Sequence, residues 1–379
     1  MCGGFIKIAQ PVDGAILNRH DGKQRSDGLE VEVRLIAPRK SGITVNGVEA
    51  EVVRGPMRFY SYGPKGGLYN EFSCNIILKE LETRIVACAD NSRTSSTVIT
   101  VLWDENSIRR YRFSVDNNIL FLKDLAVNAR KYNSIFENDY MNFWRQIHQE
   151  YGTRIQFNIY YQTEEFNLSQ VPSKYKSEWE ENSNWLRLTF HALHGEPKPY
   201  INASYRDMER DFRLVSGEIE RFAGKSLLST FTTVHWGETT LEACRALRDN
   251  GIKGLVGYFT VDPENGKPTV SYYLGEEETK YLREHDYWKD TREDLIFIKH
   301  DLVINDVDLE DIIPALNSIA SDPHQSEVME VMVHEEYFRP ELHSYEADIK
   351  ERVEITTEWL TKNGYKSVFY DEGFLGSPQ

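Results

Sequence analysis

The chain has 379 residues and a formal net charge of −16, and 40% of its residues are hydrophobic. This length favours two folded domains over one, because domains usually contain roughly 100–250 residues, and the composition excludes a chain that is disordered throughout. The negative charge disfavours nucleic acid or an anionic membrane surface as a partner, since both would be repelled, so neutral or cationic substrates fit better.

Neither a membrane span nor a signal peptide is expected in the chain as given. No apolar run reaches the roughly 18 residues that a membrane helix needs, and residues 1–14 contain no apolar core of a signal peptide. The four cysteines are scattered without paired spacing. They indicate neither a disulfide framework nor a cysteine zinc site, so a metal ion would have to be bound by histidine and carboxylate side chains.

Residues 1–105 are predicted to form an all-β domain. Apolar residues at 29, 31, 33 and 35 alternate with charged ones, which is typical of a half-buried strand. Asn46-Gly47 separates two short β-type runs and suits a type I′ hairpin turn. Further strands are expected at 71–77, 83–89 and 97–103, with no helix between them. Short strands at regular spacing predict a β-sandwich that contributes no catalytic residue.

A polar linker is expected at 106–117, and residues 118–379 then alternate between strands and helices. The expected strands are 118–122, 154–160, 186–190, 228–234, 254–259, 295–299, 328–333 and 367–370. Helical spacing is found at 140–151, 208–222 and 349–360, and Thr239 and Glu242 form a capping-box pair that opens another helix. About eight βα units in roughly 260 residues predict an irregular (β/α) barrel, with its active site at the C-terminal ends of the strands.

Polar residues gather at those expected strand ends. Asp124 closes the first barrel strand, the His191/His194 pair the third, His235 the fourth, His300-Asp301 the sixth and His334 the seventh. One carboxylate and two imidazoles, from Asp124, His191 and His194, would leave open positions on Zn²⁺ or a similar ion, as a catalytic site requires. The alternative is that both histidines are ordinary surface or core residues of a loop.

The order of these motifs resembles the polysaccharide deacetylase family, carbohydrate esterase family four. That family has a strand ending T-F-D-D-G, then H-[ST]-x-x-H, then R-x-P-Y-G, and a late strand that ends in histidine. The corresponding segments here are FLKDL at 121–125, HALH at 191–194, TVHWG at 233–237 and VH at 333–334. The resemblance covers residues 118–373 and implies a deacetylase-type barrel.

The N-terminal part resembles bacterial immunoglobulin-like modules found on carbohydrate-active enzymes. Those modules share an I-x-V-N-G hairpin, a strand ending A-x-D and a final x-V-x-V strand. Here these pieces are at 43–47, 87–90 and 98–101. The resemblance implies an immunoglobulin-like sandwich.

The family resemblance implies one divalent ion, with zinc preferred over cobalt, manganese or nickel, bound by Asp124, His191 and His194. It also implies that His334 is the acid and that activated water attacks the acyl carbonyl of an N- or O-acetylated sugar. The family's base is replaced by Lys123 and its arginine by Thr233. His235 and Asp301 are the candidates for the base, and each has the alternative role of orienting a ligand.

Aromatic residues that follow the expected strands, Tyr160, Trp236 and Tyr337, could stack on sugar rings or only pack beneath loops. The expected partner is a carbohydrate. Two other functions stay open: a catalytically impaired carbohydrate-binding protein, which Lys123 and Thr233 favour, and a metal-dependent hydrolase of another amide or ester. The compartment, the oligomeric state and the sugar are left open, and the resemblance is compatible with an extracytoplasmic location.

Overall fold

The structure, a computed structural model, describes residues 5–58, 67–89, 96–198 and 200–378. The chain divides into two compact units. The N-terminal unit comprises Met1–Ser107 and the short segment Lys289–Arg292, and the C-terminal unit comprises Ile108–Trp288 and Glu293–Gln379. Each unit is described by itself.

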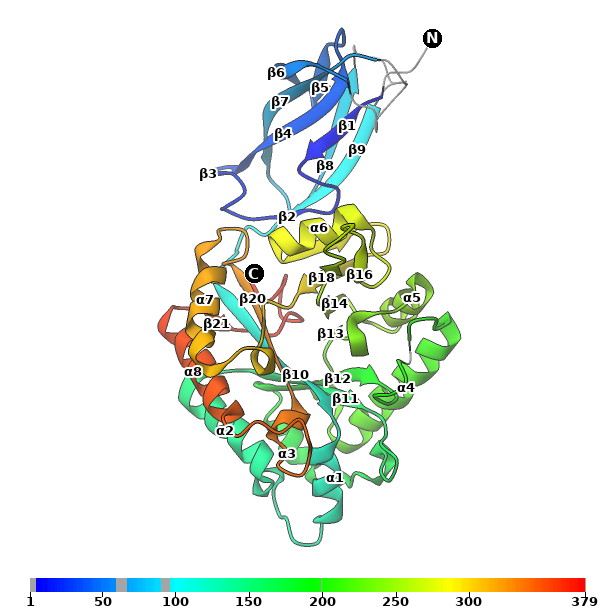
Figure 1. Cartoon of the computed structure of the whole chain (residues 1–379), viewed down its shortest axis with the longest axis vertical. Helices are drawn as coiled ribbons and strands as arrows, with labels where there is room; N and C mark the ends of the chain where they lie inside the picture. The colour runs from blue at the N-terminus through cyan, green and yellow to red at the C-terminus, as the bar shows by residue number, and fades with distance from the viewer. Residues whose placement is uncertain (1–4, 59–66, 90–95, 199, 379) are drawn as a thin grey trace. The chain divides into compact units, whose positions relative to one another are not determined.

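The N-terminal unit consists of strands, with no helix among its described residues (Figure 1). Its main strand order is β1-β4-β7-β6-β5-β8-β9-β2, and β3 pairs with β4. The alternation at 29–35 is confirmed, because the apolar side chains of this part of β4 are buried. The strands are β1 (Lys7–Gln10), β2 (Ile16–Leu17), β3 (Lys23–Arg25), β4 (Gly28–Pro38), β5 (Ile43–Val45), β6 (Val48–Met57), β7 (Tyr69–Leu78), β8 (Glu82–Ala89) and β9 (Ser96–Trp103).

The predicted hairpin turn between β5 and β6 is confirmed. Val45 pairs with Val48 across it, and both turn residues have positive φ, 47° at Asn46 and 84° at Gly47. These are the angles that a type I′ turn requires. Asp90, the last residue of the expected A-x-D motif, lies outside the described residues. The immunoglobulin-like classification stays a prediction.

The C-terminal unit is built around parallel strands that curl, as its centre in Figure 1 shows. One sheet has the order β12-β11-β10-β20-β19, with β21 beside β10, and the other has the order β13-β14-β18-β17. A parallel bridge between Leu188 and Leu228 joins β12 to the segment before β13. The strands are β10 (Arg110–Asn118), β11 (Ile155–Tyr160), β12 (Leu186–Ala192), β13 (Phe231–Thr232), β14 (Gly254–Gly257), β17 (Tyr287–Asp290), β18 (Leu295–Lys299), β19 (Leu302–Val303), β20 (Val328–His334) and β21 (Lys366–Ser367).

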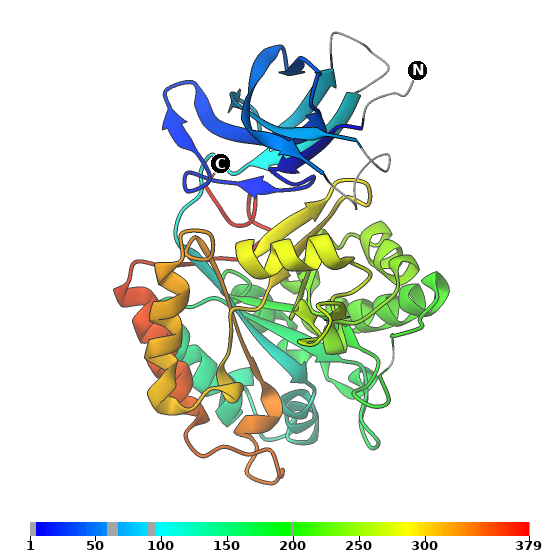
Figure 2. The same ribbon diagram turned by 45° about the horizontal axis from the view of Figure 1, so that its top comes forward.

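Helices lie around the outside of these strands (Figure 1). In both views α7 and α8 lie side by side (Figure 2), and the Trp359 indole N–H on α8 donates to Asn317 on α7. None of the helices in the described part of the chain is long and apolar enough to cross a membrane. The helices are α1 (Leu120–Val127), α2 (Asp139–Tyr151), α3 (Lys176–Glu181), α4 (Tyr205–Phe222), α5 (Leu241–Asp249), α6 (Glu276–His285), α7 (Ile312–Ser321) and α8 (Ile349–Lys362).

The expected linker at 106–117 and the expected strand at 118–122 are both wrong. Residues 110–118 form β10, a central strand, and residues 120–127 form α1. The polar appearance of this segment comes from Arg110 and Arg112, both fully buried. Arg112 forms an ion pair with Glu330 on the neighbouring β20, at 3.0 Å. A charge that is paired inside the sheet looks like a solvated charge in the sequence.

Smaller differences concern element ends. The N-cap of α5 is Thr240, whose hydroxyl accepts from the Ala243 N–H at 3.1 Å, whereas Thr239 is buried and donates to the Tyr200 carbonyl. The expected strand at 228–234 is reduced to β13. Residues 260–290 contain the short strands β15 (Thr260–Val261) and β16 (Pro268–Val270), followed by α6 and β17.

Candidate functional site

A cleft of about 580 Å³ opens in the C-terminal unit. Its walls come from the residues that end or follow β10, β11, β12 and β20. Their parallel arrangement brings the C-terminal ends of these strands to one edge, which is where the sequence placed the site. The cleft is lined by Asn117, Ile119, Leu120, Tyr160, Gln162, Thr163, Glu164, His194, Gly195, Glu196 and Glu336.

His191 lies at the end of β12, beside this cleft, and only 1% of it is exposed. Its Nδ1 is 2.6 Å from the carbonyl oxygen of Thr233. A carbonyl oxygen can only accept, so Nδ1 carries the ring proton and Nε2 carries the lone pair. That Nε2 lies 3.1 Å from Oδ1 of Asn117.

His235, in the turn after β13, is oriented by a second carbonyl. Its Nε2 is 2.9 Å from the Gly195 oxygen and therefore donates, which leaves the lone pair on Nδ1. This Nδ1 faces Nε2 of His191 at 3.2 Å and the hydroxyl of Tyr160 at 2.9 Å. The amide of Asn117 is oriented too, because its Nδ2 donates to Glu336 at 2.8 Å and its Oδ1 is left facing His191.

Three acceptor atoms therefore face one another: Nε2 of His191, Nδ1 of His235 and Oδ1 of Asn117. In the described part of the chain the Tyr160 hydroxyl supplies one proton to this group, in a short hydrogen bond to Asn117. Burial, and then the neighbouring imidazole, lowers the pKa of His235 to about 3, and burial lowers the pKa of His191 to about 3. Two neutral imidazoles, each fixed by a carbonyl, together with an amide oxygen form a donor set that fits a borderline divalent cation.

Trp236 helps to fix the backbone next to His235. Its φ is 70°, in the left-handed region that a bulky side chain rarely adopts, and Gly237 follows with a φ of 61°. Such a conformation costs about 1–3 kcal/mol and persists where the surroundings determine it. The indole is 41% exposed, and the Lys198 ammonium lies over its ring, 4.6 Å from the centroid. The turn thus holds His235 inward and leaves an aromatic face at the surface.

Asp116 lies near the end of β10, directly before Asn117, and is 2% exposed. The Asn158 amide donates to its carboxylate, and Asn158 in turn accepts from Gln156 at 2.9 Å. Burial raises the pKa of Asp116, while the nearby His334 opposes this increase. A buried carboxylate that directly precedes Asn117 and lies near His334 is able to take a proton from a water molecule.

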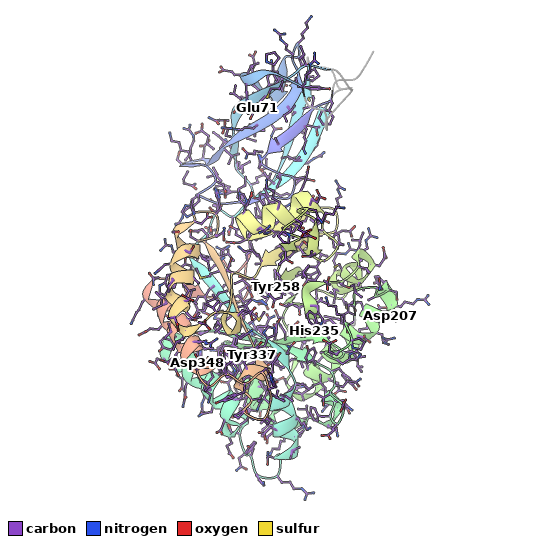
Figure 3. The ribbon with its side chains drawn as sticks, in the orientation of Figure 1. Glu71, Asp207, His235, Tyr258, Tyr337 and Asp348 are labelled. Atoms are coloured by element: carbon purple, nitrogen blue, oxygen red, sulfur yellow. The ribbon has the colours of Figure 1, made fainter. Side chains whose placement is uncertain are left out.

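His334, at the end of β20, is held by Asn305. Its Nδ1 is 2.9 Å from Asn305 Oδ1, and the Asn305 amide is oriented by donating to Asp306 at 2.7 Å. Nδ1 of His334 therefore carries the proton, and Nε2 carries the lone pair. Burial lowers the pKa of His334. Figure 3 shows His235 and Tyr337 in the middle of this unit, with Asp207 and Asp348 at its outer edge.

The expected ligand set of Asp124, His191 and His194 is not brought together. Among the described residues, these three do not place ligand atoms within 4.8 Å of one another. Asp124 lies in α1, because β10 ends at Asn118, six residues before Asp124, and the Asp124 carboxylate accepts from Asn128 at 2.8 Å and Asn138 at 2.6 Å. His194 does line the cleft, and its Nδ1 is buried without a partner in the described part of the chain.

The other predicted site residues separate into two groups. His235 belongs to the acceptor group and the Tyr160 hydroxyl contacts it, whereas Trp236 and Tyr337 do not line the cleft. Asp301 forms an ion pair with Lys299, at 3.1 Å, and accepts from the Glu330 N–H. Burial raises its pKa.

Lys123, which the resemblance placed at the base position, points elsewhere. Its ammonium forms an ion pair with Glu165 at 3.0 Å. The strand end that the resemblance assigned to Lys123 and Asp124 is occupied in the structure by Asp116 and Asn117. The sequence analysis missed both, although the alternation of apolar residues at 111, 113 and 115 could have located this strand.

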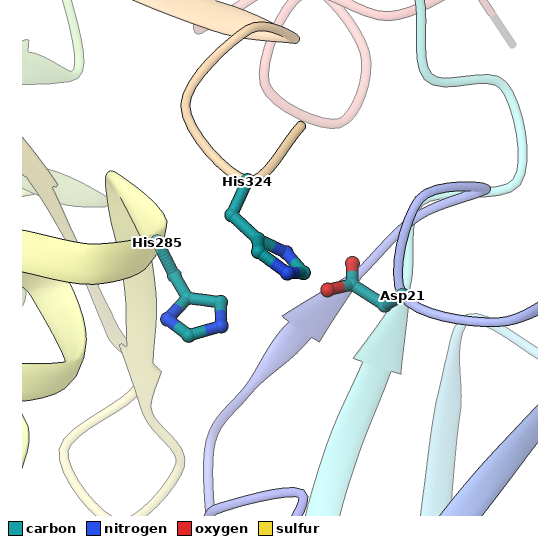
Figure 4. Close-up of side chains that lie close together, drawn as sticks. All are labelled: Asp21, His285 and His324. Carbon is teal, nitrogen blue, oxygen red and sulfur yellow. The ribbon is translucent and has the colours of Figure 1, made fainter. Parts of the chain in front are cut away.

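A second pair of histidines lies away from the cleft. The ring of His285, at the end of α6, stacks on Tyr281 and lies 4.7 Å from the ring of His324 (Figure 4). Asp21, also drawn in Figure 4, belongs to the N-terminal unit.

No protein-family model matches the sequence, and no curated protein matches it. Solved structures with a similar chain course include a peptidoglycan N-acetylglucosamine deacetylase, with 9% identity, a TM-score of 0.36 and coverage of 71% of this chain and 90% of that one. A Mycobacterium smegmatis protein assigned to the polysaccharide deacetylases has 10% identity, a TM-score of 0.40 and coverage of 73% and 95%. A pseudoenzyme of carbohydrate esterase family four from Bacillus anthracis has 9% identity, a TM-score of 0.30 and coverage of 69% and 63%. At these identities and TM-scores the solved structures assign no function to the site, whose chemistry therefore rests on its own residues.

Proposed function

We propose that this protein is a metal-dependent hydrolase that removes an acyl group from a carbohydrate. The observation that supports this proposal best is the group of three acceptor atoms on Asn117, His191 and His235. Asn117 directly follows the buried Asp116 in the chain and lines an open cleft. Metal ligands next to a general base in a solvent-accessible cleft are the parts that metal-assisted hydrolysis requires.

Asn117, His191 and His235 would bind the ion, with His194 at the cleft wall as the next candidate. A divalent ion bound there would polarise an acyl carbonyl and make water a better nucleophile near neutral pH. Asp116 would accept the proton of the attacking water, because its carboxylate is fixed by Asn158 and has no cation bound to it directly among the described contacts. The proton that Asp116 takes up would pass to the lone pair on Nε2 of His334, and His334, held in register by Asn305, would deliver it to the leaving nitrogen or oxygen.

A carbohydrate is the proposed substrate because an aromatic ring is exposed next to the reacting groups. Trp236 directly follows His235, and their rings are 5.4 Å apart. Tyr160, which lines the cleft, has its hydroxyl at the acceptor group. An aromatic face with polar groups beside it suits the alternating apolar and hydroxyl surface of a sugar.

The metal site is tested by measuring metal content and zinc affinity of the purified full-length protein. His191→Ala and His235→Ala should each lower zinc affinity at least about 10²-fold, because each removes a ligand to the ion. Asp124→Asn is the matched control, since the sequence assigned Asp124 to the metal and the structure places it in α1. Loss of zinc in Asp124→Asn with zinc retained in His235→Ala would contradict the proposed ligand set.

Hydrolysis is tested by acetate release from a panel of N- and O-acetylated oligosaccharides with zinc, cobalt or manganese supplied. Asp116→Asn should lower turnover by roughly 10²–10⁴-fold and leave zinc content unchanged, because it removes the base and keeps the shape of the side chain. An equal loss of zinc and turnover in that variant would mean that Asp116 acts as a ligand.

A second candidate function is a carbohydrate-binding protein without hydrolytic activity. The observation that favours it is Asn117, because a neutral amide attracts a cation less strongly than a carboxylate does. Absence of acetate release over the whole panel, with zinc bound and sugar binding intact, would support this function over hydrolysis.

A further inference from the structure

Two histidines of the C-terminal unit, His285 and His324, take no part in the proposed reaction. His285 is the last residue of α6, and His324 lies in the turn between α7 and β20. Their ring centroids are 4.7 Å apart, and the ring planes make an angle of 44° (Figure 4). A ligand nitrogen of one lies within 4.8 Å of a ligand nitrogen of the other, and both side chains are half-buried. Two imidazoles from separate segments are thus brought to one place.

The ring of His285 is oriented by Tyr281, one turn earlier in α6. Its Nδ1 is 3.3 Å from the Tyr281 carbonyl oxygen, and the two rings stack with centroids 4.1 Å apart and an angle of 5°. A carbonyl oxygen can only accept, so Nδ1 carries the ring proton and Nε2 carries the lone pair. A fixed tautomer and ring plane are what a metal-binding imidazole requires.

The turn that carries His324 is fixed by Asp322. The Asp322 carboxylate accepts from the His324 N–H at 2.9 Å and from the Gln325 side-chain amide at 3.0 Å. The Gln325 N–H donates to the Asp322 carbonyl at 3.1 Å. An aspartate that binds the backbone two residues later stabilises a turn locally. The position of His324 is therefore determined by its own neighbours in the chain.

Lys299, at the end of β18, ties these two segments together. Its ammonium forms an ion pair with the Asp286 carboxylate at 3.0 Å and donates to Oε1 of Gln325 at 3.0 Å. Its N–H donates to the Asp286 carbonyl at 2.7 Å. Asp286 follows His285 and Gln325 follows His324, so one lysine holds the residue next to each histidine. These contacts use the backbone and neighbouring side chains, and they keep the two rings close whether or not an ion is bound.

Imidazole nitrogens are the ligands that copper, nickel and zinc ions accept readily, whereas magnesium and calcium ions prefer oxygen. Two nitrogens bound to one zinc ion lie roughly 3–3.5 Å apart, because each bond is about 2.0–2.1 Å long and the geometry is tetrahedral. Rings at the separation of His285 and His324 need only a small rotation to reach it.

We propose that His285 and His324 form a second metal site, for a borderline divalent ion such as Cu²⁺, Ni²⁺ or Zn²⁺, with water completing the coordination. The site is separate from the cleft and goes beyond the proposed hydrolysis. A bound ion links the end of α6 to the turn after α7 and stabilises the folded protein, because it binds the assembled pair better than the separated histidines of an unfolded chain.

The test titrates chelator-treated full-length protein with copper alone, and in a second series with zinc alone, by calorimetry. We expect His285→Ala and His324→Ala each to weaken the binding of one ion at least about 10²-fold, since each removes a direct ligand. Copper should bind this site more tightly than zinc. Saturating copper should raise the melting temperature of the unmodified protein by roughly 2–4 °C more than that of either variant.

The matched control is His148→Ala. His148 also stacks on an aromatic ring, that of Trp185 at 4.4 Å, and its Nδ1 is 3.0 Å from the Thr153 carbonyl oxygen. In the described part of the chain it belongs to no cluster of three possible ligands. The control should bind copper as the unmodified protein does. Using variants from two separate segments keeps the test valid if His285→Ala disturbs the packing of α6.

Unchanged copper stoichiometry and affinity in both His285→Ala and His324→Ala would overturn this inference, and so would an equal loss in His148→Ala. The proposed function is judged by a different ion. His191→Ala should lose the ion of the cleft and keep the ion bound by His285 and His324, whereas His285→Ala should release acetate at the unmodified rate. Absence of acetate release from every substrate, with the copper result as expected, would reject hydrolysis and retain the second metal site.

Discussion

Asn117 contributes the oxygen among the three acceptor atoms at the cleft, and its identity determines the charge of the candidate metal centre. With an amide at this position, all three acceptor atoms are neutral, and the carboxylate of Glu336 contacts Asn117 through the amide nitrogen. Carboxylate oxygens bind divalent cations more strongly than amide oxygens because they carry a formal charge. The side chain at 117 would therefore set how tightly the proposed site binds an ion.

Asn117→Asp is predicted to increase zinc affinity by about tenfold or more, because it adds a negative charge where Oδ1 already faces His191. Zinc affinity measured by competition with a chelator checks this. The control is Asn158→Asp, which places the same charge beside Asp116, one residue before Asn117. An unchanged affinity in Asn117→Asp would show that Oδ1 does not contact the ion.

At the scale of elements, the start of α1 fixes the position of the C-terminal end of β10, which directly precedes it. The N-cap residue of α1 is Ile119, which has no side-chain acceptor, and the helix is capped by Glu335 from the end of β20. The buried Glu335 carboxylate accepts from the N–H groups of Ile119 and Leu120 at 2.8 Å and of Phe121 at 2.7 Å. This contact fixes β10, β20 and α1 to one another next to the cleft.

Glu335→Gln is predicted to lower the free energy of unfolding by roughly 1–3 kcal/mol, because an amide offers one acceptor oxygen to these N–H groups and leaves Arg339 without its anion. Denaturant unfolding followed by circular dichroism measures the change. The nearby exposed Glu341→Gln serves as the control and should stay within about 0.5 kcal/mol of the unmodified protein. Similar changes in both variants would contradict the capping role.

At the scale of the whole molecule, the two units differ in secondary structure. The described part of the N-terminal unit contains strands β1 to β9 and no α-helix, whereas α1 to α8 begin after residue 107. The short segment Lys289–Arg292 groups with the N-terminal unit, where the Lys289 N–H donates to the Gly14 carbonyl at 3.0 Å. The N-terminal unit is thus assembled from two separate parts of the chain.

A fragment of residues 1–107 is predicted to show a β-type circular dichroism spectrum without helical minima. It is also predicted to melt at a lower temperature than the corresponding β transition of the full chain, since it lacks the contact to the segment at 289–292. Circular dichroism of the fragment and of the full-length protein tests both points. A strongly helical spectrum of the fragment would contradict the assignment of the two units.

The sequence by itself determined the elements in which buried side chains and solvent-facing side chains recur with a regular period. The strands at 71–77, 83–89 and 97–103, the helix at 140–151 and the Asn46-Gly47 turn were predicted and are present, because local periodicity and turn chemistry do not depend on distant residues. His235 and Tyr160 were also singled out from their positions at strand ends, and the structure brings them together with His191.

Only the tertiary structure decided which residues meet at the cleft. The charge of Arg112 led to the prediction of a solvated linker in place of β10. In the structure this charge is neutralised inside the sheet by Glu330, which lies more than two hundred residues later in the chain. The shift of that strand replaced Asp124 with Asn117 at the site. The direction of each imidazole lone pair depends on the carbonyls of Thr233 and Gly195, which are contacts between elements. Such pairings carry no local signal in the sequence, because the residue type does not show whether a charged side chain is buried or exposed.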